Sequence, residues 1–305
     1  MNDFYKDYSE YMAGIFPGMK VQKISLNAGF TCPNRDGTFG HSGCAYCNNV
    51  SFTPSYCMEG DPVELQLEKG RTFFSRKYPK MKYLAYFQSY TNTYGASLQR
   101  LSRLWEEALA QENVVGLDVA TRPDCLSQEV VEALSKLNSR VPVFVELGAE
   151  SADDEVLKRV DRHHGWAEVE DAARRCADAG LHVGLHLIAG LPGDSVEGVL
   201  NSVDAACSLP IDSVKLHHLQ VIKGTRLHDM WQRREFSLLF PDAESYLQFC
   251  VEVVRHVPSH ICIERFLASS PPSMVAAPSW GMKNHEFVNA LHNLLRRLNV
   301  ENNDR

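Results

Sequence analysis

The sequence predicts an α/β fold built on a parallel sheet, and two patterns in its 305 residues support that prediction. Strand-like runs rich in branched and aromatic residues alternate with amphipathic helical stretches, which is the pattern of parallel strands joined by helical crossovers. After a long first interval, successive strand-like runs begin about 30 residues apart, the usual length of one such unit. Six units of this kind fit an open sheet or an incomplete barrel, and both place ligands at the carboxyl ends of the strands.

The predicted elements cover most of the chain. Apolar runs predict strands at residues 21–26, 83–88, 114–120, 142–147, 181–188 and 213–219. Amphipathic periodicity predicts helices at residues 63–77, 98–111, 128–138, 166–179 and 196–207. We expect one main domain at residues 1–226, with a long loop at 27–56, followed by a C-terminal extension at 227–305. In that extension we expect helices at residues 243–256 and 284–298 and a short strand at 261–265.

Composition and charge restrict the class of protein. With 44% hydrophobic residues, the chain can bury a large core. No apolar stretch reaches the roughly 18 residues that span a bilayer, and the first residues lack the order of a signal peptide, so we expect a cytoplasmic protein with no membrane contact. Nine cysteines are an odd number in a long chain, which favours reduced thiols over a disulfide framework. A formal charge of -7 argues against strong sequence-independent binding to nucleic acid.

Three of the cysteines, Cys32, Cys44 and Cys47, lie together in the glycine-rich loop after the first predicted strand. Three thiolates can hold three irons of a [4Fe-4S] cluster and leave the fourth iron open to a small molecule. A zinc site completed by His41 and a chance grouping of buried thiols are the alternatives. Structural zinc sites usually close with four ligands at shorter paired spacings, so the pattern favours a cluster and therefore an enzyme.

Residues 44–47 read Cys-Ala-Tyr-Cys, and eleven residues separate Cys44 from Cys32. This ending resembles the radical S-adenosylmethionine (SAM) superfamily, whose first barrel strand is followed by three cysteines ending in Cys-x-aromatic-Cys. The long gap departs from the shorter one that is commonest there and is similar to that of the elongator-type tRNA-modifying branch. Over nearly the whole chain the sequence resembles the YhcC/YtqA-type family, through residues 26–37 with supporting segments at 121–126, 145–148 and 190–193.

The resemblance implies a fold, a reaction and cofactors. The fold would be an incomplete (β/α)6 radical-SAM barrel with a C-terminal α/β extension. The three loop cysteines would hold a [4Fe-4S] cluster whose open iron binds SAM, and reductive cleavage of SAM would give a 5′-deoxyadenosyl radical. Such a reaction implies an electron donor, for example a flavodoxin or a ferredoxin.

The sequence leaves three functions open. The likeness to the elongator-type branch, together with basic residues near the sixth strand, favours modification of a tRNA base, with a partner protein supplying RNA contacts that an acidic chain lacks. Radical chemistry on a small metabolite or tetrapyrrole is the second, since the motifs also resemble the oxygen-independent coproporphyrinogen oxidase branch. The third is an iron-sulfur or zinc protein that binds a partner without catalysis.

The resemblance also assigns residues to SAM, mostly in loops that follow the strands. These residues are Tyr46, Gln88, Thr91, Asn92, Glu146, Gly148, Glu150, Ser151, Arg162, His186 and Gly190. Glu150 and Ser151 suit ribose hydroxyls or the ammonium group, and a glycine at 148 permits close backbone approach to a ligand. Arg162 suits the carboxylate because a guanidinium binds it bidentately, with Arg159 as the second choice.

Several candidate residues have an equally reasonable structural interpretation. Tyr46 can be a packing aromatic, the polar loop after the second strand can be a solvated turn, and His186 can be a hydrogen-bonded structural histidine. Cys57 and Cys125 lie near the predicted mouth, where a thiol can relay a radical or bind the cluster, but inert thiols are the simpler interpretation.

Two further groups of residues belong to the predicted mouth of the fold. Strand alternation puts Lys215 and His217 on one face of the sixth strand and His218 on the other. Arg122 and Asp124, after the third strand, suit either the substrate side of the site or a buried ion pair that fixes their loop.

Overall fold

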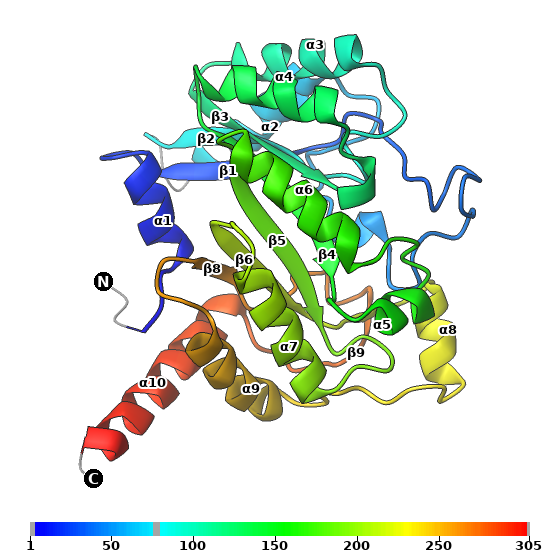
Figure 1. Ribbon diagram of the computed structural model, residues 1–305, viewed down its shortest axis with the longest axis vertical. Coiled ribbons are helices and arrows are strands. Elements are labelled where there is room, and N and C mark those ends of the chain that lie inside the picture. The colour runs from blue at the N-terminus through cyan, green and yellow to red at the C-terminus, as the bar shows by residue number, and fades with distance from the viewer. Residues whose placement is uncertain (1–3, 76–79, 304–305) are drawn as a thin grey trace.

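A seven-stranded sheet forms the centre of the molecule and curls into a half-barrel (Figure 1). The structure, a computed structural model, describes residues 4–75 and 80–303. The strand order is β1-β2-β3-β4-β5-β6-β8, and every neighbouring pair is parallel. The carboxyl ends of the strands therefore meet at one end of the half-barrel, where the predicted site loops begin. The predicted incomplete barrel is confirmed, and the C-terminal extension adds the seventh strand to it.

The sheet consists of β1 Val21–Leu26, β2 Lys82–Phe87, β3 Val114–Thr121, β4 Val143–Glu150, β5 His182–Ala189, β6 Ser213–His218 and β8 Cys262–Arg265. A separate antiparallel pair is formed by β7 Val221–Ile222 and β9 Val275–Ala277. The helices are α1 Tyr8–Ile15, α2 Val63–Ser75, α3 Leu98–Leu109, α4 Gln128–Asn138, α5 Asp154–Arg159, α6 Trp166–Asp178, α7 Val196–Cys207, α8 Arg226–Gln232, α9 Ala243–His256 and α10 Asn284–Asn303. None of the helices in the described ranges is long and apolar enough to cross a membrane.

The predicted elements agree with most of these bounds. The helices predicted at 128–138, 196–207 and 243–256 have the observed limits, whereas β4 runs past its predicted end at residue 147. The predicted end of α2 at residue 77 lies outside the described residues. The helices α1, α5 and α8 were not predicted because each is short, yet each begins after a capping side chain, that of Asp7, Asp153 or Thr225.

Helix α1 covers the amino-terminal end of the half-barrel. Its residues Tyr11 and Met12, with Phe16 just beyond it, form a hydrophobic cluster with Leu84 and Phe144 near the starts of β2 and β4. The Tyr11 hydroxyl also lies 3.3 Å from His182 Nδ1 at the start of β5. The interior of the sheet is therefore closed by apolar side chains at the end opposite the predicted site.

The C-terminal extension packs against the sheet and not beside it as a separate unit. β8 pairs with β6, and the Tyr246 hydroxyl of α9 donates to the Phe266 carbonyl at 2.6 Å. Trp280 stacks on His218 of β6, with ring centroids 4.4 Å apart. His218 thus faces the extension while Lys215 faces the interior of the half-barrel, as alternation predicted. The boundary at residue 226 stays a prediction.

We expect Tyr246→Phe to lower the free energy of unfolding by about 1–3 kcal/mol, because it leaves the buried Phe266 carbonyl without its donor. Denaturant unfolding followed by circular dichroism measures this change. Tyr83→Phe is the matched control, since Tyr83 is also a buried core tyrosine but no hydrogen bond of its hydroxyl occurs among the described residues. Equal losses in the two variants would contradict a role for this bond in fixing the extension.

Candidate functional site

The cysteine loop follows β1 and folds back on itself. The amide of Arg35 donates to the Cys32 carbonyl at 2.8 Å, and the amide of Gly43 donates to the Asn34 carbonyl at 2.8 Å. Gly43 has a φ of +75°, in the left-handed region that glycine adopts without strain. These bonds close the segment that separates Cys32 from Cys44 in the sequence.

The three loop thiols are free and near one another. Burial, and next the neighbouring Cys44, raise the pKa of Cys47 to about 11, with a smaller contribution from Cys32. A thiolate in this place therefore needs a cationic partner, which a metal centre supplies. Across residues 4–75 and 80–303, however, no three His, Cys, Asp or Glu side chains converge closely enough for a single metal ion. Three thiols are the donor set of a cluster that keeps one iron open, whereas a structural zinc site needs a fourth protein ligand.

The loop is fixed to the turn after α5 by two donors that reach Cys44. Asn34 Nδ2 lies 3.1 Å from the Cys44 sulfur and also donates to the Asp161 carbonyl at 2.8 Å. Arg162 Nη1 lies 3.7 Å from the same sulfur. Donors aimed at a ligand sulfur stabilise the thiolate and tune the potential of a bound cluster.

Arg162 connects the cysteine loop to the carboxyl end of β4. Its Nη2 donates to the Gly148 carbonyl at 2.5 Å and lies 3.4 Å from Glu150 Oε1. Burial opposes the charge on Arg162, but Tyr46 and Glu150 lead the neighbours that raise its pKa well above the usual value, so the guanidinium stays charged. Its Nε is buried and has no partner among the described residues.

The end of β4 is irregular. The pairing of β4 with β5 shifts register between Gly148 and Glu150, and Glu150 has a left-handed φ of +70°. A Cβ at Gly148 would lie 2.7 Å from Arg162 Nη2, so this glycine makes room for a side chain of the protein itself. Ser151 accepts from the Asp153 amide at 3.1 Å and is buried, which gives it a structural role in the turn.

The polar loop after β2 is buried, which rules out the solvated-turn interpretation. Thr91 and Asn92 are 1% and 0% exposed. Asn92 Nδ2 donates to the Ala120 carbonyl of β3 at 2.8 Å, while its Oδ1 has no partner in the part of the chain that the structure describes. Gln88 is half-buried at the end of β2. The loop therefore leaves one amide oxygen unsatisfied near the carboxyl ends of the strands.

Tyr46 and Gly190 both contact apolar side chains close to these loops. Tyr46 packs against a second hydrophobic cluster that contains Val160 and Leu191, and its buried hydroxyl has no partner within the described ranges. Gly190 has a φ of +92°, and a Cβ there would lie 3.1 Å from Leu239 Cβ. Glycine at this position thus lets the segment that contains Leu239 pass close to the turn after β5.

Arg122 and Asp124 form an ion pair, as one of their two predicted roles requires, but only Arg122 is buried in it. Arg122 Nε and Nη2 donate to the two carboxylate oxygens of Asp124 at 2.9 and 2.8 Å. Burial raises the pKa of Cys125 and of Cys57 to about 12, so both thiols are protonated and weakly nucleophilic. Cys57 also donates to Gln66 Oε1 at 3.2 Å.

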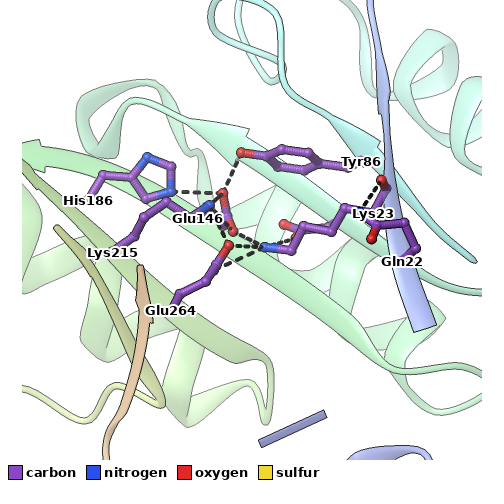
Figure 2. A network of polar contacts seen from close by, with 8 residues as sticks. Gln22, Lys23, Tyr86, Glu146, His186, Lys215 and Glu264 are labelled. Carbon is purple, nitrogen blue, oxygen red and sulfur yellow. Dashed lines mark hydrogen bonds and ion pairs between the residues drawn. The ribbon is translucent and has the colours of Figure 1, made fainter. Parts of the chain in front are cut away.

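An ionic network fills the interior of the half-barrel between the α1 end and the cysteine loop. Figure 2 shows the side chains that surround Glu146, which are Lys23, Tyr86, His186, Lys215 and Glu264. Glu146 Oε2 accepts from the Tyr86 hydroxyl at 2.5 Å and lies 2.7 Å from His186 Nε2. Its Oε1 lies 2.7 Å from Lys215 Nζ and also contacts Lys23. Both oxygens of Glu146 are thus engaged, and its predicted contact with SAM stays a prediction.

Two further carboxylates complete the network. Glu264 Oε1 lies 3.0 Å from Lys215 Nζ and 3.1 Å from Lys23 Nζ, and Asp118 Oδ2 lies 2.9 Å from Lys23 Nζ without a well-directed hydrogen bond. Burial, and next the charge of Glu146, raise the pKa of Asp118 to about 7. Lys215 and Lys23 outweigh burial at Glu146 and hold the pKa of that carboxyl well below its usual value. Asp118 is therefore the carboxyl of the network that takes up a proton near neutral pH.

Sequence analysis did not find Lys23, Asp118 or Glu264. A signal was present, since each is a charged residue inside a strand, where a charge is rarely buried without a partner. The partners of these three charges lie on strands that are far apart in the chain, so a local sequence pattern does not show them.

Two sequence profiles cover most of the chain. The profile of the Radical SAM superfamily matches residues 32–206, and that of the Radical_SAM C-terminal domain matches residues 211–297. Protein YhcC of Escherichia coli strain K12 is 35% identical over 264 residues, which are 86% of this chain and 83% of YhcC. Together the two profiles span most of the half-barrel and most of the extension.

Two archaeal proteins are also similar to the chain. The tRNA uridine(34) acetyltransferase of Methanocaldococcus infernus is 34% identical over 147 residues, which are 46% of this chain and 27% of that protein. The solved structure of an N-terminally shortened Elp3 from the same organism has a TM-score of 0.67 at 21% identity, and the match covers 94% of this chain and 64% of that one. That likeness shows a shared fold. The chain therefore belongs to the radical SAM superfamily of enzymes, in its YhcC/YtqA-type family, and its cofactors are a [4Fe-4S] cluster and SAM.

Proposed function

We propose that this enzyme cleaves SAM reductively and uses the resulting 5′-deoxyadenosyl radical to modify a base of tRNA. The observation that carries the first half is the group of neighbouring free thiols in a loop closed by its own hydrogen bonds. Cys32, Cys44 and Cys47 would hold the cluster, which supplies the electron for cleavage once SAM occupies its open iron. Asn34 and Arg162 would stabilise the Cys44 thiolate.

Polar groups without partners support SAM binding beside the loop. Arg162 Nε, Asn92 Oδ1 and the Tyr46 hydroxyl are buried and unsatisfied within the described residues. A guanidinium donor suits the carboxylate of SAM, and an amide oxygen suits its ammonium group. Because an unpaired buried polar atom destabilises a fold, a ligand that satisfies these atoms would bind favourably.

The other predicted SAM residues fall into two groups. Gln88, Thr91, Gly148, Glu150, Ser151 and Gly190 lie at the carboxyl ends of β2, β4 and β5, and we propose them as neighbours of SAM. Glu146 and His186 belong to the ionic network, where we propose that Glu146 acts on a ligand only through His186. The His186 side chain keeps 20% of its exposure, against 4% for Glu146.

A relative that acts on tRNA supports the tRNA half of the proposal, whereas the acidic net charge of the chain argues against strong direct binding of RNA. The similar tRNA uridine(34) acetyltransferase acts on tRNA by its name, but the matched segment is a minor part of it. Arg226, at the predicted basic mouth, pairs with Asp161 at 2.6 Å, and Lys223 donates to the Ser273 carbonyl at 2.9 Å. With a net charge of -7 as well, we propose that a partner protein supplies most phosphate contacts. We propose a flavodoxin or a ferredoxin as the electron donor.

Replacing Cys44 with Ala should abolish cluster assembly and production of 5′-deoxyadenosine, because two thiolates cannot hold the cluster with one iron open. Iron and sulfide content, electron paramagnetic resonance of the reduced protein, and anaerobic product analysis measure these losses. Cys125→Ala is the matched control, since Cys125 is also close enough to Cys32 for the two thiols to interact electrostatically, yet we assign it no iron. A full cluster in Cys44→Ala, or loss of the cluster in Cys125→Ala, would overturn the ligand assignment.

Replacing Arg162 with Gln should weaken SAM binding about ten- to a hundredfold, the range expected for loss of a charge-assisted hydrogen bond. Equilibrium dialysis with the reconstituted protein measures this affinity. Arg159→Gln is the control, because Arg159 is exposed and lies over Gly193. If Arg159→Gln lost affinity and Arg162→Gln did not, the carboxylate would belong to Arg159.

A strain that lacks the gene should also lack one modified tRNA nucleoside, and the wild-type gene but not the Cys44→Ala variant should restore it. Liquid chromatography with mass spectrometry of digested total tRNA makes the comparison. An unchanged nucleoside profile, with SAM cleavage intact in the purified protein, would keep the radical chemistry and remove tRNA as the substrate.

A further inference from the structure

We propose that the wall of the half-barrel formed by β5, β6 and β8 carries an oxyanion-binding site made by Arg265 and His217, with the ring of His186 packed beside it, and that the substrate presents a phosphate or carboxylate group to this site. The inference rests on the proposed radical chemistry only in treating the bound anion as part of a substrate. The site lies beside the ionic network and shares no residue with the proposed cluster ligands.

A bulge in β8 brings Arg265 to this wall. Lys215 of β6 pairs with Arg265, whereas the preceding residue Val214 pairs with Ile263, so Glu264 and Arg265 together oppose one position of β6. Glu264 faces the interior, where it contacts Lys215. In a regular strand Arg265 would point to the opposite face, but a bulge bends the strand and re-aims the extra side chain.

The register of β8 makes Arg265 a neighbour of His217, because Arg265 pairs with Lys215 of β6. Burial, and next the charge of Arg265, hold the pKa of His217 well below its usual value. His217 lies on the same face as Lys215, two positions closer to the carboxyl end of the strand. Arg265 is thus near the imidazole of His217 and at the mouth end of the network.

His186 completes the group. Its ring stacks on that of His217, with centroids 5.7 Å apart and an interplanar angle of 23°. His186 Nε2 is bound to Glu146, and Figure 2 shows the rest of the ring directed away from that carboxylate. His217 Nε2 is buried and has no partner within the described residues. His217 Nε2 is therefore the ring nitrogen that remains available beside the guanidinium.

Charge balance distinguishes Arg265 from the other cations inside the half-barrel. Lys23 and Lys215 each contact at least two carboxylates. Arg265 forms no hydrogen bond or ion pair with any side chain in the described ranges, and its neighbour Glu264 is turned toward the lysines.

The guanidinium of Arg265 is therefore the cation that the network leaves uncompensated. A half-buried guanidinium without an anion retains its full capacity for a bidentate contact, and phosphate and carboxylate are the groups that match its fork. One uncompensated cation fits one oxyanion. The imidazole of His217 can donate a further hydrogen bond from Nε2, which favours an anion with several acceptor oxygens.

Binding of inorganic phosphate and of acetate to the reconstituted protein tests the proposal, with phosphate and carboxylate as separate arms. Titration calorimetry at low ionic strength measures wild type, Arg265→Gln and Arg265→Lys. We expect Arg265→Gln to lose about tenfold or more in affinity for the anion that binds, and Arg265→Lys to lose less because it keeps the charge but not the fork. Arg103→Gln, on the exposed surface of α3, is the control and should bind as wild type does.

The outcomes separate this inference from the proposed function. If wild-type protein binds neither anion, or if Arg265→Gln and wild type bind equally, the oxyanion site is wrong whatever the protein does with SAM. If the anion binds through Arg265 but wild type yields no 5′-deoxyadenosine, the oxyanion site stands and the proposed function fails. Circular dichroism melting of each variant keeps the comparison to folded protein, and the Arg265→Lys arm decides if Arg265→Gln does not fold.

Discussion

The two edge strands of the sheet are joined by an ion pair across the open side of the half-barrel, and the shape of the site depends on this contact. Lys23 lies on β1 and Glu264 on β8, the first and last strands of the sheet, yet Lys23 Nζ is 3.1 Å from Glu264 Oε1. Nearby, the backbone of Asp7 forms an isolated parallel β-bridge with Ile263 of β8. Removing one partner of a buried ion pair leaves an uncompensated charge and destabilises the fold by about 3–5 kcal/mol. These contacts therefore hold the curl of the sheet, whose two edge strands are not neighbours in the hydrogen-bonded strand order.

The curl in turn divides the interior into levels. Apolar residues of α1 close the amino-terminal end, and Tyr8 lies over the Lys23 ammonium at 5.0 Å, where the helix meets the network. Above this level the lysines of the network contact carboxylates around Glu146. Buried groups without a hydrogen-bond partner among the described residues, such as Asn92 Oδ1 and Arg162 Nε, occur at the mouth. These groups favour ligand binding at the carboxyl ends of the strands.

The fold was predictable where periodicity is local and long. The apolar run of β1 and the amphipathic pattern of α4 are examples, and both match the observed bounds. The irregularities that shape the site were not predictable, because a shift of register depends on the neighbouring strand. The end of β4 at Glu150 and the bulge at Arg265 are both of this kind. The same limit applies to Glu146, which was named as a SAM residue from its position while its partners on β1 and β6 come from distant segments.

The long gap before Cys44 illustrates how a sequence departure can leave a site intact. The extra residues form a closed excursion, because the Gly43 amide returns to the Asn34 carbonyl at 2.8 Å, and the first and second cysteines are brought back together. The Asn34 side chain then reaches the Cys44 sulfur at 3.1 Å. At the tip, Phe39 stacks on His163 with centroids 5.5 Å apart, which ties the excursion to the turn that carries Arg162. The residues that lengthen the loop thus join the thiols to the proposed SAM arginine, so the gap adds contacts around the cluster site without changing the number of its ligands.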